Sequence, residues 1–124
     1  MNADEPGRIT SANSIQENEA IFDIAPDSFV DLEPIIMNAG TILWNGPIGF
    51  FEKENFFAGT AMIAEMIISS KGFSVAGGGD TISAAEKAGV LDSLDYVSTA
   101  GGAFLEFMEG KKLPALEALI DKVN

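Results

Sequence analysis

The chain has 124 residues and a mass of 13.1 kDa, with 19 Asp and Glu against 7 Lys and Arg, for a net charge of −12. This length allows one domain at most, and a hydrophobic content of 47% is enough to fill a core. Cysteine and histidine are absent, which excludes disulfides, Cys/His zinc sites, thiol nucleophiles and Ser-His-Asp triads.

The acidic balance also limits the partners. Nucleic acid is not expected, because gripping a phosphate polyanion takes clustered Lys and Arg. No apolar run approaches the ~20 residues that span a bilayer, and MNADEPGR lacks the features of a secretory signal. The sequence therefore predicts a cytoplasmic protein that does not bind membranes.

The first 18 residues are polar and without periodicity, so residues 1–18 are predicted to form a polar arm or mobile start, with the ordered part at 19–124. Four short apolar runs beyond it are strand candidates, at 19–24, 41–45, 73–77 and 95–99. They lack strict alternation, which favours strands covered on both faces, as in parallel sheets.

Helical patterns lie between these runs. They cover residues 55–70, where Phe56, Ile63, Met66 and Ile67 share one side, then 80–88, 102–109 and a last helix from Pro114 with a stripe of Leu116, Leu119, Ile120 and Val123. Asp80 or Thr81 is a candidate N-cap and Gly89 a C-cap. Ser28 is a candidate cap for a further helix to Ala39, in which Pro34 predicts a kink or a late start. Strand and helix alternate, so the predicted fold is α/β, a partial Rossmann-like parallel sheet with helices on both faces.

Five glycines stand at the carboxyl ends of two predicted strands, Gly77, Gly78 and Gly79 after FSVA, and Gly101 and Gly102 after YVSTA. Ligands of open parallel sheets bind at such ends, where glycine lets backbone amides approach an anion at a helix N-terminus. Tight strand-to-helix turns would explain one such cluster without a ligand. Two equivalent clusters favour a phosphate site.

Asp80 follows these glycines directly and would repel a phosphate unless a cation lay between them. Mg²⁺ prefers one or two carboxylates together with phosphate oxygens, so Asp80 is a candidate magnesium ligand, with the N-cap as its structural alternative. Thr81 has the same two alternatives, a phosphate contact or a cap.

The segment WNGPIGFFE at 44–52 is a third strand end with an unusually apolar loop, in which Pro47, Ile48, Phe50 and Phe51 suit a flat base. Asn45, Gly46 and Pro47 are also ordinary turn residues, and Glu52 is either a ribose ligand or one charge of a solvated run. Trp44 is expected in the core.

Together, WNGPIGFFE, FFAGT, VAGGGDTISA and YVSTAGGAFLEFMEGKKLPALEAL, with DIAP upstream, resemble the C-terminal portion of phosphoglycerate kinase in order and spacing. The resemblance implies a glycolytic transferase that moves a phosphoryl group between 1,3-bisphosphoglycerate and Mg-ADP. It places Asp80 beside the magnesium, Gly77, Gly78, Gly79 and Thr81 at the phosphates, Asn45, Gly46, Pro47 and Glu52 around the nucleoside, and Gly101 and Gly102 at the transferred group. Ala25 and Ala100 stand where the family has glycine.

The resemblance covers only the latter part of a nucleotide-binding domain, truncated relative to the family's two-domain architecture. The domain that binds phosphoglycerate and the phosphate-binding lysines are not in the matched part, and Lys87 lies on a helix flank. Three alternatives stay open: a kinase fragment that is not competent alone, a weak ATP- or ADP-binding module that needs Mg²⁺, and a half-domain that self-associates through an exposed sheet edge.

Overall fold

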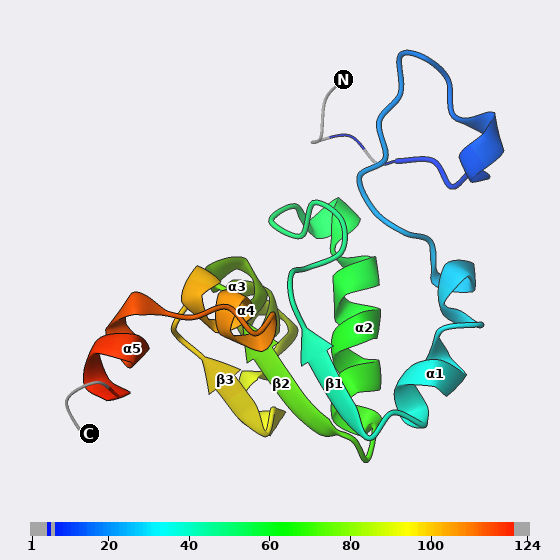
Figure 1. Cartoon of the computed structure of the whole chain (residues 1–124). Coiled ribbons are helices and arrows are strands. Elements are labelled where there is room, and N and C mark those ends of the chain that lie inside the picture. The colour runs from blue at the N-terminus through cyan, green and yellow to red at the C-terminus, as the bar shows by residue number, and fades with distance from the viewer. Residues whose placement is uncertain (1–4, 6, 121–124) are drawn as a thin grey trace.

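Three parallel strands at the centre of the chain form one sheet, in the order β1-β2-β3 (Figure 1). In this computed structural model, which describes residues 5 and 7–120, β1 spans Thr41–Trp44, β2 Phe73–Gly77 and β3 Tyr96–Ser98. Trp44 pairs with Ala76, and Gly77 pairs with Ser98. The parallel α/β fold and three of the four predicted strands are confirmed.

The fourth predicted strand, residues 19–24, is wrong. This segment lies outside the sheet, and its long-range backbone hydrogen bond among the described residues runs from Phe50 N to Phe22 O at 2.7 Å. An apolar run predicts an extended, partly buried chain, but it does not supply the neighbouring strand that a ladder requires.

The described residues form five α-helices: α1 Glu33–Met37, α2 Ala58–Ser69, α3 Gly79–Ala88, α4 Gly102–Met108 and α5 Pro114–Ile120. Four of them follow the predicted pattern closely, whereas the predicted cap at Ser28 is wrong, because Ser28 lies within a 3-10 turn and Leu32 is the N-cap of α1. Short 3-10 turns lie at Ala12–Ser14, Pro26–Phe29, Glu54–Phe56 and Leu91–Ser93. The late start at Pro34 is confirmed, because α1 begins at Glu33 and a proline in the first turn lacks only a donor that has no helical partner there. Gly89 ends α3 in the left-handed region, with φ +71°.

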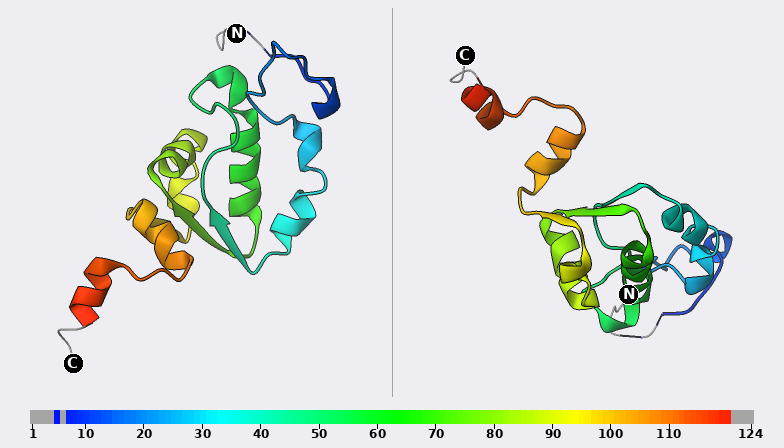
Figure 2. Two further views of the ribbon diagram at one scale, coloured as in Figure 1. Left: turned by 45° about the horizontal axis from the view of Figure 1, so that its top comes forward. Right: turned by 90° about the horizontal axis from the view of Figure 1, so that it is seen from below.

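The core fills the space between the sheet and two helices. Figure 2 shows α2 and α3 on the same side of the strands. Trp44 and Ala76 from the sheet pack there with Ala64 and Ile67 of α2 and with Ala84 of α3. The prediction that Trp44 belongs to the core is therefore confirmed, since 5% of it is exposed.

The opposite face of the sheet is largely uncovered. Leu43, Phe73 and Tyr96 are 43%, 53% and 52% exposed. The chain that follows β3 runs into α4 on this side of the sheet (Figure 2). α4 and α5 contain no buried residue in the part of the chain that the structure describes. Of the predicted stripe on the last helix, Leu116, Leu119 and Ile120 are exposed, and Val123 lies outside the described residues.

A side chain outside the strands ties β2 to β3 at their amino ends. Asp95 Oδ2 accepts hydrogen bonds of 2.8 Å from Ser74 N and from Ser74 Oγ, and Asp95 N donates to Ser74 Oγ at 3.0 Å. These bonds to the charged carboxylate hold the pKa of Asp95 below its ordinary value. Because Ser74 is buried, this link also satisfies polar atoms that would otherwise be without a partner.

An ion pair between described residues closes the segment before the sheet on itself. Arg8 Nε donates to Glu19 Oε1 at 2.7 Å, and Gln16 N donates to the other oxygen at 2.9 Å. The Arg8 hydrogen bond, helped by that of Gln16, lowers the pKa of Glu19 to about 2.

Candidate functional site

The carboxyl ends of the three strands place three loops along one edge of the sheet. The loop after Trp44 carries Asn45 and Gly46, the turn from the end of β2 into α3 is formed by Gly77–Gly79, and the turn after β3 carries Gly101 and Gly102. Parallel pairing brings these ends together because every strand finishes at the same edge (Figure 1). In open parallel sheets this edge is where ligands bind.

The middle turn is built on Gly78. Its φ of +98° and ψ of +144° are open to glycine but costly for other residues, and it is the N-cap of α3. The predicted cap at Asp80 or Thr81 is therefore wrong: the glycine turn enters the helix earlier and places Asp80 inside the first turn. Gly79 and Asp80 are exposed there, at the positive end of the helix dipole.

Thr81 joins two of the strand ends through one hydroxyl. Its side chain is 1% exposed, it donates to Gly77 O at 2.8 Å, and it accepts from Gly46 N at 2.8 Å. A Cβ on Gly78 would lie 3.6 Å from this hydroxyl and 4.0 Å from Asn45 Oδ1. Asn45, Gly46, Gly78 and Thr81 thus form one cluster, in which the Thr81 hydroxyl bonds protein atoms.

A second group of the predicted residues lines an open concavity of about 480 Å³ beside this cluster. Its charged residues are Glu52 and Asp80, and its apolar walls come from two segments. These walls are formed by Ile21, Phe22, Pro47, Gly49, Phe50 and Phe51. The structure therefore brings Asp80 to the same concavity as Pro47 and Glu52, although Asp80 lies 28 residues or more further along the chain.

The third turn lies further along the edge. Gly101 is the N-cap of α4 with φ +56°, and a Cβ on Gly101 or Gly102 would meet no atom within 4 Å. Positive φ is confined to glycines among the described residues, so Ala100 avoids the left-handed region, and Ala25 has φ −69°. Both alanines fit their turns without strain.

Phe104 of α4 lies over the neighbouring turn, where a Cβ on Gly77 would come within 2.5 Å of its ring.

Two residues near the site have contacts that sequence reasoning did not predict. Asp23 bonds the amino end of α2, where its Oδ2 accepts from Gly59 N at 3.0 Å. Lys87, at the far end of α3, donates to Phe51 O at 2.7 Å. Asp23 could have been identified from the sequence, because it belongs to the DIAP segment that resembles a family motif. For Lys87 the sequence offers only the charge of the side chain, which does not indicate its contact with Phe51.

A magnesium ion at this edge would depend on ligands from outside the protein. Among the described residues, no group of three Asp or Glu side chains is placed to hold a metal ion. One carboxylate beside glycine amides fits a metal that arrives with its own phosphate oxygens, because Mg²⁺ in such sites takes one or two carboxylates and the rest from phosphate and water.

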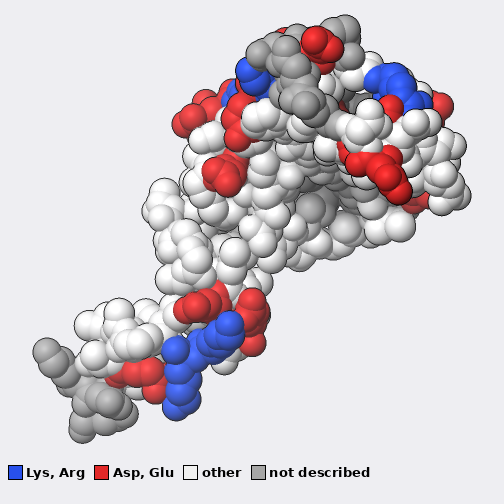
Figure 3. All heavy atoms as spheres, turned by 90° about the horizontal axis from the view of Figure 1, so that it is seen from above, with Lys and Arg blue, Asp and Glu red and all other residues white. Residues whose placement is uncertain are grey.

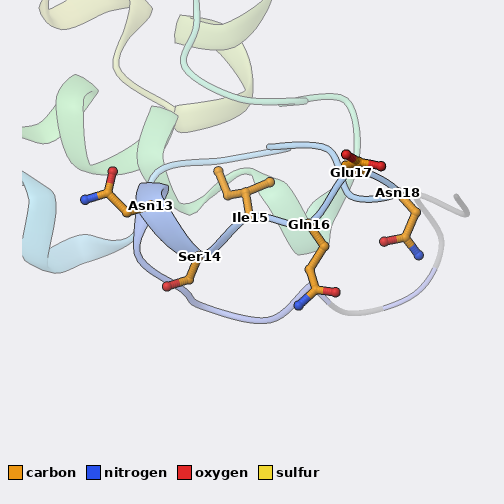
Figure 4. Close-up of a pocket in the computed structure, with 6 residues that line it drawn as sticks. All are labelled: Asn13, Ser14, Ile15, Gln16, Glu17 and Asn18. Carbon is orange, nitrogen blue, oxygen red and sulfur yellow. The ribbon is translucent and has the colours of Figure 1, made fainter.

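A larger concavity, of about 650 Å³, lies against residues 13–18 in the amino-terminal segment. All of its lining residues come from one loop, and Figure 4 shows their side chains pointing in different directions. Convergent polar groups, which a ligand site requires, are found at the sheet edge and not at this loop.

Charge is distributed unevenly over the surface. Figure 3 shows acidic side chains in several separate groups on one face, with basic side chains near some of them. Lys111 pairs with Glu109 at 2.7 Å, and Lys112 pairs with Glu117 at 3.1 Å. Within the described part of the chain, the helices are too short or too polar to cross a bilayer.

The parallel sheet, the glycine turns at its carboxyl edge and the acidic residue in the first turn of α3 define an open α/β protein with helices that start at glycine-rich strand ends. A sequence model described as "Phosphoglycerate kinase" matches residues 1–111. The chain belongs to the phosphoglycerate kinase family.

Individual relatives agree with this assignment. The phosphoglycerate kinase of Vibrio campbellii is 56% identical over 111 residues, which are 90% of this chain and 29% of that protein. The structure of phosphoglycerate kinase from Coxiella burnetii superimposes with a TM-score of 0.87 at 44% identity, over 94% of this chain and 30% of that one. The enzyme from Pyrococcus horikoshii gives a TM-score of 0.72 at 41% identity, over 81% of this chain and 24% of that one. The chain thus spans less than a third of the length of these relatives.

Proposed function

We propose that residues 19–124 are the C-terminal portion of the nucleotide-binding domain of a phosphoglycerate kinase, and that they hold the Mg²⁺ complex of ADP or ATP. The reaction is the transfer of a phosphoryl group between 1,3-bisphosphoglycerate and Mg-ADP, which gives 3-phosphoglycerate and ATP. The observation that supports this most is the convergence of Glu52 and Asp80 on one concavity beside the Gly78 turn.

Each residue has a role that follows from its chemistry. The amides at Gly77, Gly78 and Gly79 donate to phosphate oxygens at the start of α3, and Asn45, Gly46 and Pro47 border the same space. Glu52 accepts hydrogen bonds from ribose hydroxyls, and the turn at Gly101 and Gly102 faces the transferred group. Thr81 acts through its bonds to Gly46 and Gly77, which set the distance between the loop after β1 and the turn after β2.

Asp80 would be the protein group nearest the metal. Bound Mg²⁺ would neutralise phosphate charge. Charge neutralisation and positioning of the reactants are the main contributions of a protein site to phosphoryl transfer. The Asp80 carboxylate would repel the phosphates, and this repulsion is offset only while the metal lies between them.

The isolated chain is proposed to bind nucleotide weakly and not to complete the reaction. Phosphoglycerate would be held by basic residues of the family's other domain, which the matched part does not include. Turnover in a coupled assay at a rate comparable to a full-length enzyme would contradict this part of the proposal.

Asp80→Ala tests the magnesium role, because the substitution should weaken ADP binding when Mg²⁺ is present and should not weaken it when Mg²⁺ is absent. In the presence of Mg²⁺ we expect the Kd for ADP to rise by about tenfold, because one metal ligand is lost. Without Mg²⁺ we expect the same variant to bind ADP as well as the wild type or more tightly, because a repelling charge has gone. NMR titration of both proteins measures both values.

Asp92→Ala is the matched control, since Asp92 is an exposed acid in the 3-10 turn Leu91–Ser93, after α3. It removes the same charge and should leave the Mg-ADP affinity within about twofold of the wild type. An equal loss in both variants, or no loss in Asp80→Ala, would remove Asp80 from the site.

A second candidate function, self-association, is favoured by the sheet. β1 and β3 are both edge strands of the described sheet, and the face that carries Leu43, Phe73 and Tyr96 is exposed beside them. We expect Phe73→Glu to shift a dimer to monomer in sedimentation equilibrium. A wild type that stays monomeric at millimolar concentration would exclude this candidate.

A further inference from the structure

The loop between β1 and α2 supplies Glu52 to the concavity, yet only the turn at Glu54–Phe56 gives it regular structure. Contacts from other parts of the chain therefore determine its position. Thr60, which is fully buried, exchanges two hydrogen bonds with the backbone of Ile48, and Phe22 accepts one from Phe50 N. These contacts hold the first half of the loop.

The second half of the loop is held by Lys87. Its Nζ donates to Phe51 O at 2.7 Å, lies 3.5 Å from Glu54 Oε2, and sits 4.4 Å from the centroid of the Phe57 ring. Three different interactions from one ammonium group thus converge on residues 51–57. The Lys87 side chain is 29% exposed, so part of its stem is packed as well.

These three contacts differ in how strongly they stabilise the position of the loop. Glu54 has a side chain that is 87% exposed, and exposed ion pairs contribute little. The bond to Phe51 O is charge-assisted, and Phe51 is buried, 8% exposed, which makes that carbonyl costly to leave without a donor. The ring of Phe57 adds a cation-π contact. The backbone position next to Glu52 is therefore the one that Lys87 fixes most firmly.

The same helix carries Asp80 and Lys87, seven residues apart. Two turns of helix separate them by about 10 Å and return them to one side, so Asp80 faces the concavity while Lys87 reaches the loop that borders it. A single rigid element then sets the position of both carboxylates, one directly and the other through Phe51.

We propose that Lys87 is a positioning residue for the nucleotide site, which holds the loop 51–57 so that Glu52 stays opposite Asp80. The part that concerns the nucleotide rests on the function proposed above. The part that concerns the loop stands on the contacts alone, and the two are measured separately.

Lys87→Met keeps the aliphatic stem and removes the charge and the donor. We expect it to raise the Kd for Mg-ADP by about tenfold, because the loss of one hydrogen bond to a charged group corresponds to a change of this size. We also expect hydrogen exchange to become about tenfold faster at the amides of Lys53, Phe56 and Phe57, which bond within the loop. Exchange in β2 should not change, which shows that the fold is intact.

Two further variants sharpen the test. Lys87→Arg can donate to the same carbonyl and should restore both affinity and slow exchange. Lys71→Met, at an exposed lysine between α2 and β2, removes the same charge elsewhere and should change neither. Unchanged loop exchange in Lys87→Met, or an equal loss of affinity in Lys71→Met, would overturn the proposal.

If the wild type fails to bind Mg-ADP, the proposed function fails and the nucleotide part of this inference fails with it. Hydrogen exchange then still decides whether Lys87 holds the loop. Faster exchange confined to residues 51–57 supports that part, and exchange that rises equally in β2 overturns it.

Discussion

Thr81→Val is expected to lower the free energy of unfolding by about 2–4 kcal/mol, although valine has nearly the same shape. The substitution keeps the packing of a residue that is 1% exposed but leaves Gly46 N without its acceptor and Gly77 O without its donor. Each buried polar group left alone costs about 1–3 kcal/mol. Urea denaturation followed by the fluorescence of Trp44, the single tryptophan of the chain, measures the change.

Thr81→Ser provides the matched control, because it keeps the hydroxyl and removes only a methyl group. We expect it to cost roughly 1 kcal/mol. If valine and serine destabilise equally, the hydroxyl link between the two strand ends contributes nothing to stability.

Gly49→Ala should be destabilising by about 3 kcal/mol. Gly49 has φ +69°, and a Cβ there would lie 2.6 Å from Phe22 O and 2.6 Å from Asp23 Oδ1. The left-handed conformation costs an L-residue about 1–2 kcal/mol, and forced overlap in packed structure adds about 1–3 kcal/mol. Because the clash is with backbone, one segment must move, and calorimetric unfolding should show a lower Tm.

Gly46→Ala separates the two causes of that loss. Gly46 also has positive φ, at +102°, but a Cβ there would meet no atom within 4 Å. We expect it to cost only the conformational part, about 1–2 kcal/mol. Equal losses at both positions would mean that the contact between residues 22–23 and the loop at Gly49 is not tight.

Much of the fold could be predicted because local patterns agree with it. TILW and FSVAG form strands, Gly89 ends α3, and Pro34 starts a helix late, each for a reason that a few neighbouring residues supply. The segment 19–24 could not be placed in the same way. Its extended conformation follows from composition, but strand pairing depends on a partner that no local pattern identifies.

The glycine turns of the site were predictable for the same local reason, whereas the links between its parts were not. Asp80 and Thr81 were both candidate caps of α3, yet the φ of Gly78 moves the cap upstream, which only the backbone geometry reveals. Lys87 and Phe51 lie 36 residues apart, and a lysine near a helix end looks like any solvated charge. Long-range hydrogen bonds of this kind leave no periodicity in a sequence.

The uncovered sheet face and the net charge of −12 act in opposite directions when two molecules approach each other. Apolar attraction acts only at contact, while charge repulsion extends to a Debye length of about 8 Å at physiological salt and about 3 Å at 1 M. Sulfate shortens that range and strengthens apolar burial at once, and acid near the isoelectric point of 4.1 removes the charge itself. Salting-out and isoelectric precipitation should therefore both begin where Leu43, Phe73 and Tyr96 meet solvent.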